Sequence, residues 1–239
     1  VDSVMDGTID EEAMRRVGFK WDESVPARGL TSVGGCIAAA RSALEDGLSG
    51  QLAGGSHHAH RDFGSGFCVF NDQAVAALTL LEEKRVDRIA IVDLDVHQGD
   101  GTASICQSVP DIFVLSVHGE KNFPFRKYPA DLDVGLPDAT EDADYLRAVE
   151  KALDHVWEFE PDIILYQAGV DPLEEDRLGR LSLTLDGLMS RDRLVLQSAK
   201  DRDIPVSMSI GGGYTDPIDT SVIAYANTYR VAREIWNWA

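Results

Sequence analysis

Runs of apolar residues alternate with amphipathic stretches along most of this chain. Four runs rich in β-branched and large apolar residues predict buried strands, at 88–95, 112–117, 162–169 and 204–210. Helical spacing and end signals predict helices over 9–18, 32–47, 71–84, 142–159 and 185–200, and a C-terminal helix from Thr220. Continuous apolar strands alternating with helices predict an α/β fold in three layers, with a mostly parallel central sheet covered on both faces.

Two segments do not follow this alternation. Residues 21–31 are predicted to form a loop, and residues 118–141 form the longest irregular stretch, with three prolines. Connections in compact domains are usually much shorter, and long ones commonly carry function. We therefore expect residues 118–141 to contribute to a functional site.

Length and composition favour one domain and narrow the range of partners. A chain of 239 residues with 44% apolar content is enough for a single α/β domain over residues 1–239. Because it begins at Val1, we expect leading residues to be missing. The formal net charge of −19 argues against a nucleic-acid partner and favours cationic small molecules or peptides.

Hydropathy and cysteine usage bear on the compartment. There is no apolar run near 18 residues and no hydrophobic leader, so a membrane partner is not expected. The cysteines, Cys36, Cys68 and Cys106, are odd in number and form no C-x-x-C motif. This pattern predicts neither disulfides nor a thiolate metal site, and it fits a reducing, cytoplasmic setting.

Polar residues that can carry chemistry gather where the predicted strands end. Asp93, Asp95 and His97 occupy alternate positions at the end of the first predicted strand, and Asp171 follows the third. Asp95 and His97 should point the same way, and a ligand from another strand end would complete a site of three protein ligands with an open position, as in catalytic zinc sites. An isolated D-x-H more often merely caps a helix, but Asp171 and a nearby histidine cluster reverse that preference.

The histidine cluster lies in the stretch GGSHHAHRDFGSGFCVFND, residues 54–72. His57 and His58 are adjacent, and the strand-end motif supplies two further carboxylates, Asp93 and Asp100, that are not needed as metal ligands. Each carboxylate could orient one imidazole, which is how hydrolases set a general base near neutral pH. His60, followed by Arg61 and Asp62, is expected to be a surface residue.

Tyr214 follows three glycines after the last predicted strand. Alone it is more simply a packing aromatic on a turn. Glycines also let the backbone approach a ligand closely, and a phenol beside a metal is a good donor to an oxyanion.

Four stretches together resemble the histone deacetylase family, the zinc-dependent members of the arginase-like α/β superfamily. They are GGSHHAHRDFGSGFCVFND, DLDVHQGDGT, AGVDPLEEDRLGRLSLT and SIGGGYT, in the family's order. The resemblance runs from about Ser32 to the end of the chain and is greatest to the class IV branch and bacterial deacetylase-like amidohydrolases. It implies the arginase/deacetylase-type fold.

The resemblance also implies roles for individual residues. Zinc would be held by Asp95, His97 and Asp171; His58 would be the principal general acid/base, His57 its electrostatic partner and Tyr214 the group that polarises the substrate carbonyl. Gly66, Phe67 and Phe123 would line a tunnel for an acyl-lysine stem. A structural K⁺ or Na⁺ would be bound by Asp93, Ser116 and main-chain oxygens of Asp95, His97 and Val117.

These inferences predict zinc-dependent hydrolysis of N-acyl amine bonds, with acyl-lysine peptides as the first substrate class and acylated polyamines as the alternative. A binuclear ureohydrolase is disfavoured because Asp100 does not complete a D-x-H-x-D pattern. An inactive acyl-amine-binding module stays open, because about thirty residues replace the strand and loop with which the family usually begins. The oligomeric state is left open.

Overall fold

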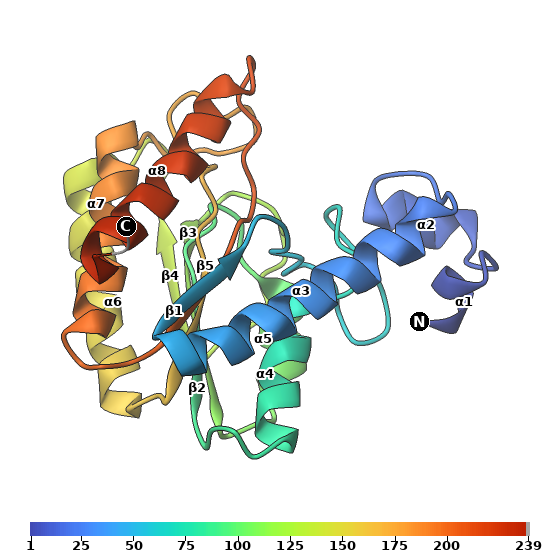
Figure 1. Ribbon diagram of the computed structural model, residues 1–239. Coiled ribbons are helices and arrows are strands. Elements are labelled where there is room, and N and C mark those ends of the chain that lie inside the picture. Colours follow the sequence, from blue (N-terminus) through green and yellow to red (C-terminus); the bar gives the residue numbers. More distant parts are fainter. Residues whose placement is uncertain (238–239) are drawn as a thin grey trace.

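The computed structural model describes residues 1–237, and within them it contains six strands and eight helices (Figure 1). The strands are β1 (Leu48–Gln51), β2 (Ile89–Asp93), β3 (Ile112–Gly119), β4 (Leu132–Leu136), β5 (Ile163–Gln167) and β6 (Val206–Ser209). The helices are α1 (Asp2–Met5), α2 (Glu11–Val17), α3 (Ser24–Asp46), α4 (Asp72–Glu82), α5 (Asp100–Cys106), α6 (Asp142–Phe159), α7 (Leu185–Lys200) and α8 (Asp219–Trp236).

All six strands form one parallel sheet in the order β1-β6-β5-β2-β3-β4. From β2 the chain proceeds through β3 and β4 toward one edge, and from β5 it proceeds through β6 toward the other. The direction of winding therefore switches between the neighbouring strands β2 and β5. Crevices at the carboxyl ends of strands beside such a switch are where open α/β sheets bind ligands.

Helices cover both faces of the sheet, which confirms the predicted three-layer arrangement. Alternate residues of each strand point to opposite faces, so Val92 joins one apolar core and Ile91 joins the other. The first core lies under α6, α7 and α8, and the second lies under α3, α4 and α5 (Figure 1). The inner strands β2, β3, β5 and β6 are buried on both faces, as their continuous apolar runs predicted, whereas the edge strands β1 and β4 are partly exposed.

Local signals fix the starts of three helices. The side chains of Asp10, Asn71 and Thr184 each accept a hydrogen bond from the backbone N–H three residues later, so they cap α2, α4 and α7. The predicted bounds 142–159 and 185–200 are those of α6 and α7. The last two positions of the expected C-terminal helix, 238–239, lie outside the described residues.

Two predictions about irregular segments were wrong. Residues 21–31 are not a loop, because α3 begins at Ser24 and runs for 23 residues. Pro26 lies in the first turn of α3, where a missing N–H costs no hydrogen bond, so it does not delay the helix. The 118–141 segment is not wholly irregular, because it contains the edge strand β4.

Several short elements were not predicted from the sequence: α1, α5 and β1. Each spans seven residues or fewer, too short for an apolar period to stand out. The three cysteines are buried and unpaired. Within residues 1–237, no helix is both long and apolar enough to span a bilayer.

Candidate active site

Three side chains that could bind a metal ion converge at the carboxyl ends of β2 and β5. His97 Nδ1 lies 3.1 Å from Asp95 Oδ1 and 2.9 Å from Asp171 Oδ2, and all three residues are buried. In a tetrahedral zinc site with bonds of about 2.0 Å, ligand atoms are separated by roughly 3.3 Å. The spacing of these atoms therefore fits a single small cation between them.

The electrostatics of this cluster also call for positive charge. Burial and the neighbouring charge of Asp95 raise the pKa of Asp171 to about 7. Burial opposes protonation of His97, but its hydrogen bonds to Asp171 and Asp95 outweigh burial and raise the pKa of His97 to about 10. A proton on His97 offsets the negative charge of Asp95 and Asp171, and a divalent cation bound between the three side chains would offset the same charge.

Backbone groups hold the two carboxylates in place. Val96 N–H donates to Asp171 Oδ1 at 2.8 Å, and Gly212 N–H donates to Asp95 Oδ2 at 2.6 Å. A Cβ atom on Gly212 would lie 1.9 Å from Asp171 Oδ2, so only glycine allows this approach. The glycine run before Tyr214 thus packs directly against the candidate ligands.

The adjacent histidines each contact a different carboxylate. His57 Nδ1 lies 2.7 Å from Asp93 Oδ2, and His58 Nδ1 lies 2.7 Å from Asp100 Oδ1. The imidazole rings are 4.1 Å apart, and all four residues are buried. Two histidine–carboxylate pairs result. Their histidines come from the glycine-rich turn, and their carboxylates come from the end of β2 and the start of α5.

The two histidines have different protonation behaviour. Burial would lower the pKa of His57, but the charges of Asp93 and Asp95 outweigh it and raise the pKa to about 9. For His58, burial and the positive charge of His57 lower the pKa to about 4, despite the hydrogen bond to Asp100. At neutral pH, His57 is thus a cation and His58 a neutral imidazole able to accept a proton.

His60 was expected at the surface, and this was wrong. Its side chain is only 10% exposed, with Nε2 3.1 Å from Asp100 Oδ2 and Nδ1 2.7 Å from Ser104 Oγ. Asp100 therefore lies between His58 and His60. The basic and acidic residues after His60 suggested solvent, but the turn folds back onto α5 and the ring stacks on Phe63.

Tyr214 comes from the loop between β6 and α8, which is a different strand end from those that carry the candidate metal ligands. Its backbone N–H donates to Asp176 Oδ2 at 2.6 Å, and its ring centroid is 6.2 Å from that of His97. Burial and the charges of Asp95 and Asp171 raise the pKa of Tyr214 above its usual range. The phenol therefore keeps its proton and can act as a hydrogen-bond donor.

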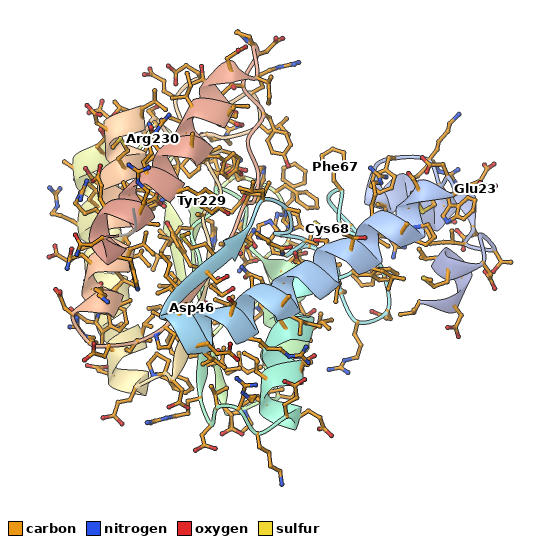
Figure 2. The ribbon with its side chains drawn as sticks, viewed as in Figure 1. Glu23, Asp46, Phe67, Cys68, Tyr229 and Arg230 are labelled. Atoms are coloured by element: carbon orange, nitrogen blue, oxygen red, sulfur yellow. The ribbon has the colours of Figure 1, made fainter. Side chains whose placement is uncertain are left out.

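A cavity of about 520 Å³ leads from the surface to these groups. His58, His97 and Tyr214 line it, together with the three residues expected to form a substrate tunnel: Gly66, Phe67 and Phe123. The Phe123 ring meets the edge of His58, with centroids 4.8 Å apart. Figure 2 shows Phe67 on the loop between β1 and α4, and its side chain is 55% exposed.

The expected monovalent-cation site stays a prediction. Asp93 and Ser116 are register partners in β2 and β3, which brings these two residues side by side. The Ser116 hydroxyl lies 3.0 Å from His118 Nδ1. Burial lowers the pKa of His118 to about 4, so a neutral imidazole adjoins the proposed site.

Sequence reasoning missed a buried ion pair behind the site. Arg191 and Asp192, on α7, are fully buried, and Arg191 donates to the carbonyls of Leu94 and Gly169 at 3.3 and 2.5 Å. Leu94 directly precedes Asp95, and Gly169 is two residues before Asp171. Arg191 therefore holds the backbone next to two candidate ligands, Asp95 after β2 and Asp171 after β5.

A signal for this pair was present in the sequence. The buried positions of α7 recur at helical spacing, and Arg191 and Asp192 occupy the same stripe as Leu188, Val195 and Leu196. Two charges on an otherwise apolar stripe indicate a buried pair, because a lone buried charge is costly.

Comparisons with known proteins agree with this architecture. The family model described as "Histone deacetylase domain" matches residues 14–229. An uncharacterized protein of Picosynechococcus sp. is 46% identical over 231 residues, covering 96% of this chain and 77% of that protein. Histone deacetylase 2 of Arabidopsis thaliana is 35% identical over 187 residues, covering 76% of this chain and 48% of that protein.

Among solved structures, an acetylpolyamine aminohydrolase from Burkholderia pseudomallei superposes with a TM-score of 0.74 at 24% identity, covering 87% of this chain and 63% of that one. At this identity the likeness establishes the fold. The chain spans about half the length of the Arabidopsis deacetylase.

The fold and the matched domain define an α/β protein of the arginase/deacetylase type. The chain belongs to the histone deacetylase family.

Proposed function

We propose that this protein hydrolyses N-acyl amine bonds, with Nε-acyl-lysine as the substrate class, and that it does so with zinc. The observation that carries the proposal is the pair of adjacent buried histidines, each 2.7 Å from its own carboxylate and with opposite shifts in pKa. Two neighbouring groups with pKa values pushed apart are typical of acid/base catalysis.

The residues that would hold the metal are Asp95, His97 and Asp171. Two carboxylates and one imidazole suit zinc and leave room for a further ligand. When bound, the ion would polarise the acyl carbonyl and lower the pKa of an attacking water.

His58 is the proton carrier in this proposal. Because it is neutral and its Nδ1 faces Asp100, its Nε2 is free to accept a proton from the attacking water. The same nitrogen then returns that proton to the departing amine. Asp100 keeps the ring oriented and stabilises its charged form between these two steps.

Two further groups stabilise charge. Tyr214 keeps its phenolic proton and donates it in a hydrogen bond to the oxygen of the acyl group as that oxygen becomes negative. His57 remains a cation through its contact with Asp93 and favours negative charge developing nearby. Phe67, Phe123 and Gly66 enclose the linear stem of the acylated side chain.

The proposal is tested by turnover of a neutral acetyl-lysine peptide together with elemental analysis of the purified protein. We expect one zinc per chain and release of free lysine side chain. Protein with one zinc but no turnover of acyl-lysine or acylated polyamine would indicate the binding-module alternative. Two metals per chain would favour the ureohydrolase alternative, and a clear preference for acetylated putrescine or spermidine would replace the substrate class while keeping the chemistry.

A further inference from the structure

The mouth of the cavity carries a charge opposite to that of the whole chain. Of the sixteen residues that line the cavity, four are Lys or Arg, and among the described residues no Asp or Glu lines it. The four, called the mouth cations below, are Arg16, Lys121, Arg177 and Arg180. The chain as a whole has a formal net charge of −19. The mouth therefore differs in charge from the chain as a whole, and it would oppose the cationic substrates that the net charge favours.

Carboxylates beside the mouth neutralise only part of this charge. Lys121 and Arg180 share Asp138, at 3.6 and 2.6 Å, and Arg177 pairs with Asp216 at 3.5 Å. Arg16 stacks over the Phe63 ring at 4.9 Å and makes no salt bridge with a described residue. The buried carboxylate of Asp176 also contacts the lining, because it accepts hydrogen bonds from the backbone of Leu178, Gly179 and Tyr214. Four cations against these three carboxylates leave a local formal charge of about +1, and the side chains of the mouth cations face solvent.

Apolar side chains stand exposed among the mouth cations. Phe125 is 91% exposed, Phe67 55% and Leu178 46%, and all three line the cavity. Hydrogen bonds hold two of these segments: the Phe67 N–H donates to the Val17 carbonyl, and the Asn122 side-chain amide donates to the Leu178 carbonyl. The mouth is thus a mixed apolar and cationic surface that extends outward from the cavity that would hold the acyl-lysine stem.

From this surface we infer that the protein selects acyl-lysine within acidic peptide segments that carry apolar neighbours, and disfavours basic segments and free polyamines. The inference rests on the proposed function. An acetylated polyamine retains at least one ammonium, which would lie against like charge at the mouth. A small carboxylate could contact the mouth cations but would leave the exposed apolar side chains uncovered. An acidic peptide segment with apolar residues could contact both.

The direct test uses three peptides with one acetyl-lysine and identical apolar neighbours, flanked by Glu, Gln or Lys. At low ionic strength we expect kcat/KM for the Glu peptide to exceed that for the Lys peptide by about tenfold, with the Gln peptide between them, because several exposed charge contacts add modestly. Equal values for the three peptides, or a preference for the Lys peptide, would overturn the inference.

Charge reversal locates the effect. The double variant Arg16→Glu/Arg177→Glu should reverse the order of the Glu and Lys peptides. Arg85→Glu is the matched control: it makes the same kind of charge change on an exposed residue between α4 and β2, near the amino end of β2, whereas the candidate site lies at the carboxyl ends of the strands. A comparable shift in Arg85→Glu would mean that net charge, rather than the mouth, sets the preference.

A binding measurement separates this inference from the proposed function. Tyr214→Phe keeps the mouth cations, so fluorescence anisotropy with labelled versions of the same peptides should show the same order of affinities in that variant. Ordered binding without turnover in the wild-type protein would reject the proposed function and keep the mouth preference. Turnover of all three peptides with equal affinities and equal kcat/KM would keep the proposed function and reject the mouth preference.

Discussion

The floor of the cavity and its mouth use charge in opposite ways. The floor comprises the candidate metal ligands and the two histidine–carboxylate pairs, all of them buried, and the contacts within each group are 2.7 to 3.1 Å. At the mouth, Lys121, Arg177 and Arg180 have side chains 51 to 68% exposed. Exposed charges are screened within about 8 Å at physiological salt, whereas buried ones are not. The net charge of the chain therefore describes neither region. The effect of each charged side chain depends on whether that side chain is buried or exposed.

This contrast predicts effects of different size and kind. Changing a floor residue should lower kcat by orders of magnitude, because buried groups act on the reacting atoms in a low dielectric. Changing a mouth residue should alter KM several-fold.

Asp171→Ala should have the largest effect. It removes one of three convergent ligand atoms, so we expect loss of bound metal and of activity with the fold retained. Elemental analysis, activity and circular dichroism measure these three properties. Arg85→Glu, near the amino end of β2 and away from the candidate ligands, is expected to keep its metal. Full metal content in Asp171→Ala would remove this residue from the metal site.

His58→Ala should lower kcat by roughly 10²- to 10⁴-fold, because it removes the proposed proton carrier. His57→Ala should be milder, since His57 stabilises charge without carrying the proton. His155→Ala, on the exposed face of α6, is the control and should match the wild-type protein. If His57→Ala is the more severe variant, the two roles are exchanged.

Tyr214→Phe should keep its zinc and lower kcat by about 10²- to 10³-fold, the usual cost of removing one donor to a developing oxyanion. Tyr229→Phe offers a matched loss of a phenol, since its hydroxyl donates to Gln51 O and does not line the cavity. We expect little change in kcat for this control. Near-normal turnover in Tyr214→Phe would leave carbonyl polarisation to other groups.

Salt should have the smallest effect and separate the two regions. Raising ionic strength from low to physiological values should lower kcat/KM for an acidic acyl-lysine peptide a few-fold while leaving kcat nearly constant, because screening reaches the mouth and not the floor. Steady-state kinetics with KCl at fixed pH measure this. A salt effect carried mainly by kcat would contradict the division.

The sequence predicted the fold best where apolar residues recur over a long stretch, either as a continuous run or at helical spacing. The parallel sheet and helices α6 and α7 followed from apolar runs and stripes. The start of α3 was missed, although Pro26 is compatible with the first turn of a helix. Short elements such as β1 and α5 depend on pairing with distant segments, which a local period does not record.

For the candidate site, strand-end positions and motif spacing were informative because parallel strands bring their carboxyl ends together. Asp95 and Asp171 are 76 residues apart in number and lie in one cluster because β2 and β5 are neighbours. The charge of the mouth was not predictable in the same way. Arg16, Lys121 and Arg177 come from three segments without a shared motif, and only the folded chain assembles them.

The position of α2 has a consequence for how this protein can diversify. Helices α1 and α2 lie at the far end of the long helix α3, away from the sheet (Figure 1), yet residues Arg16 to Gly18 reach the cavity. Under the inference above, part of substrate selection would depend on a peripheral stretch that includes none of the candidate metal ligands. Substitutions in residues 11–20, by evolution or by design, would then change substrate preference without altering the candidate catalytic residues.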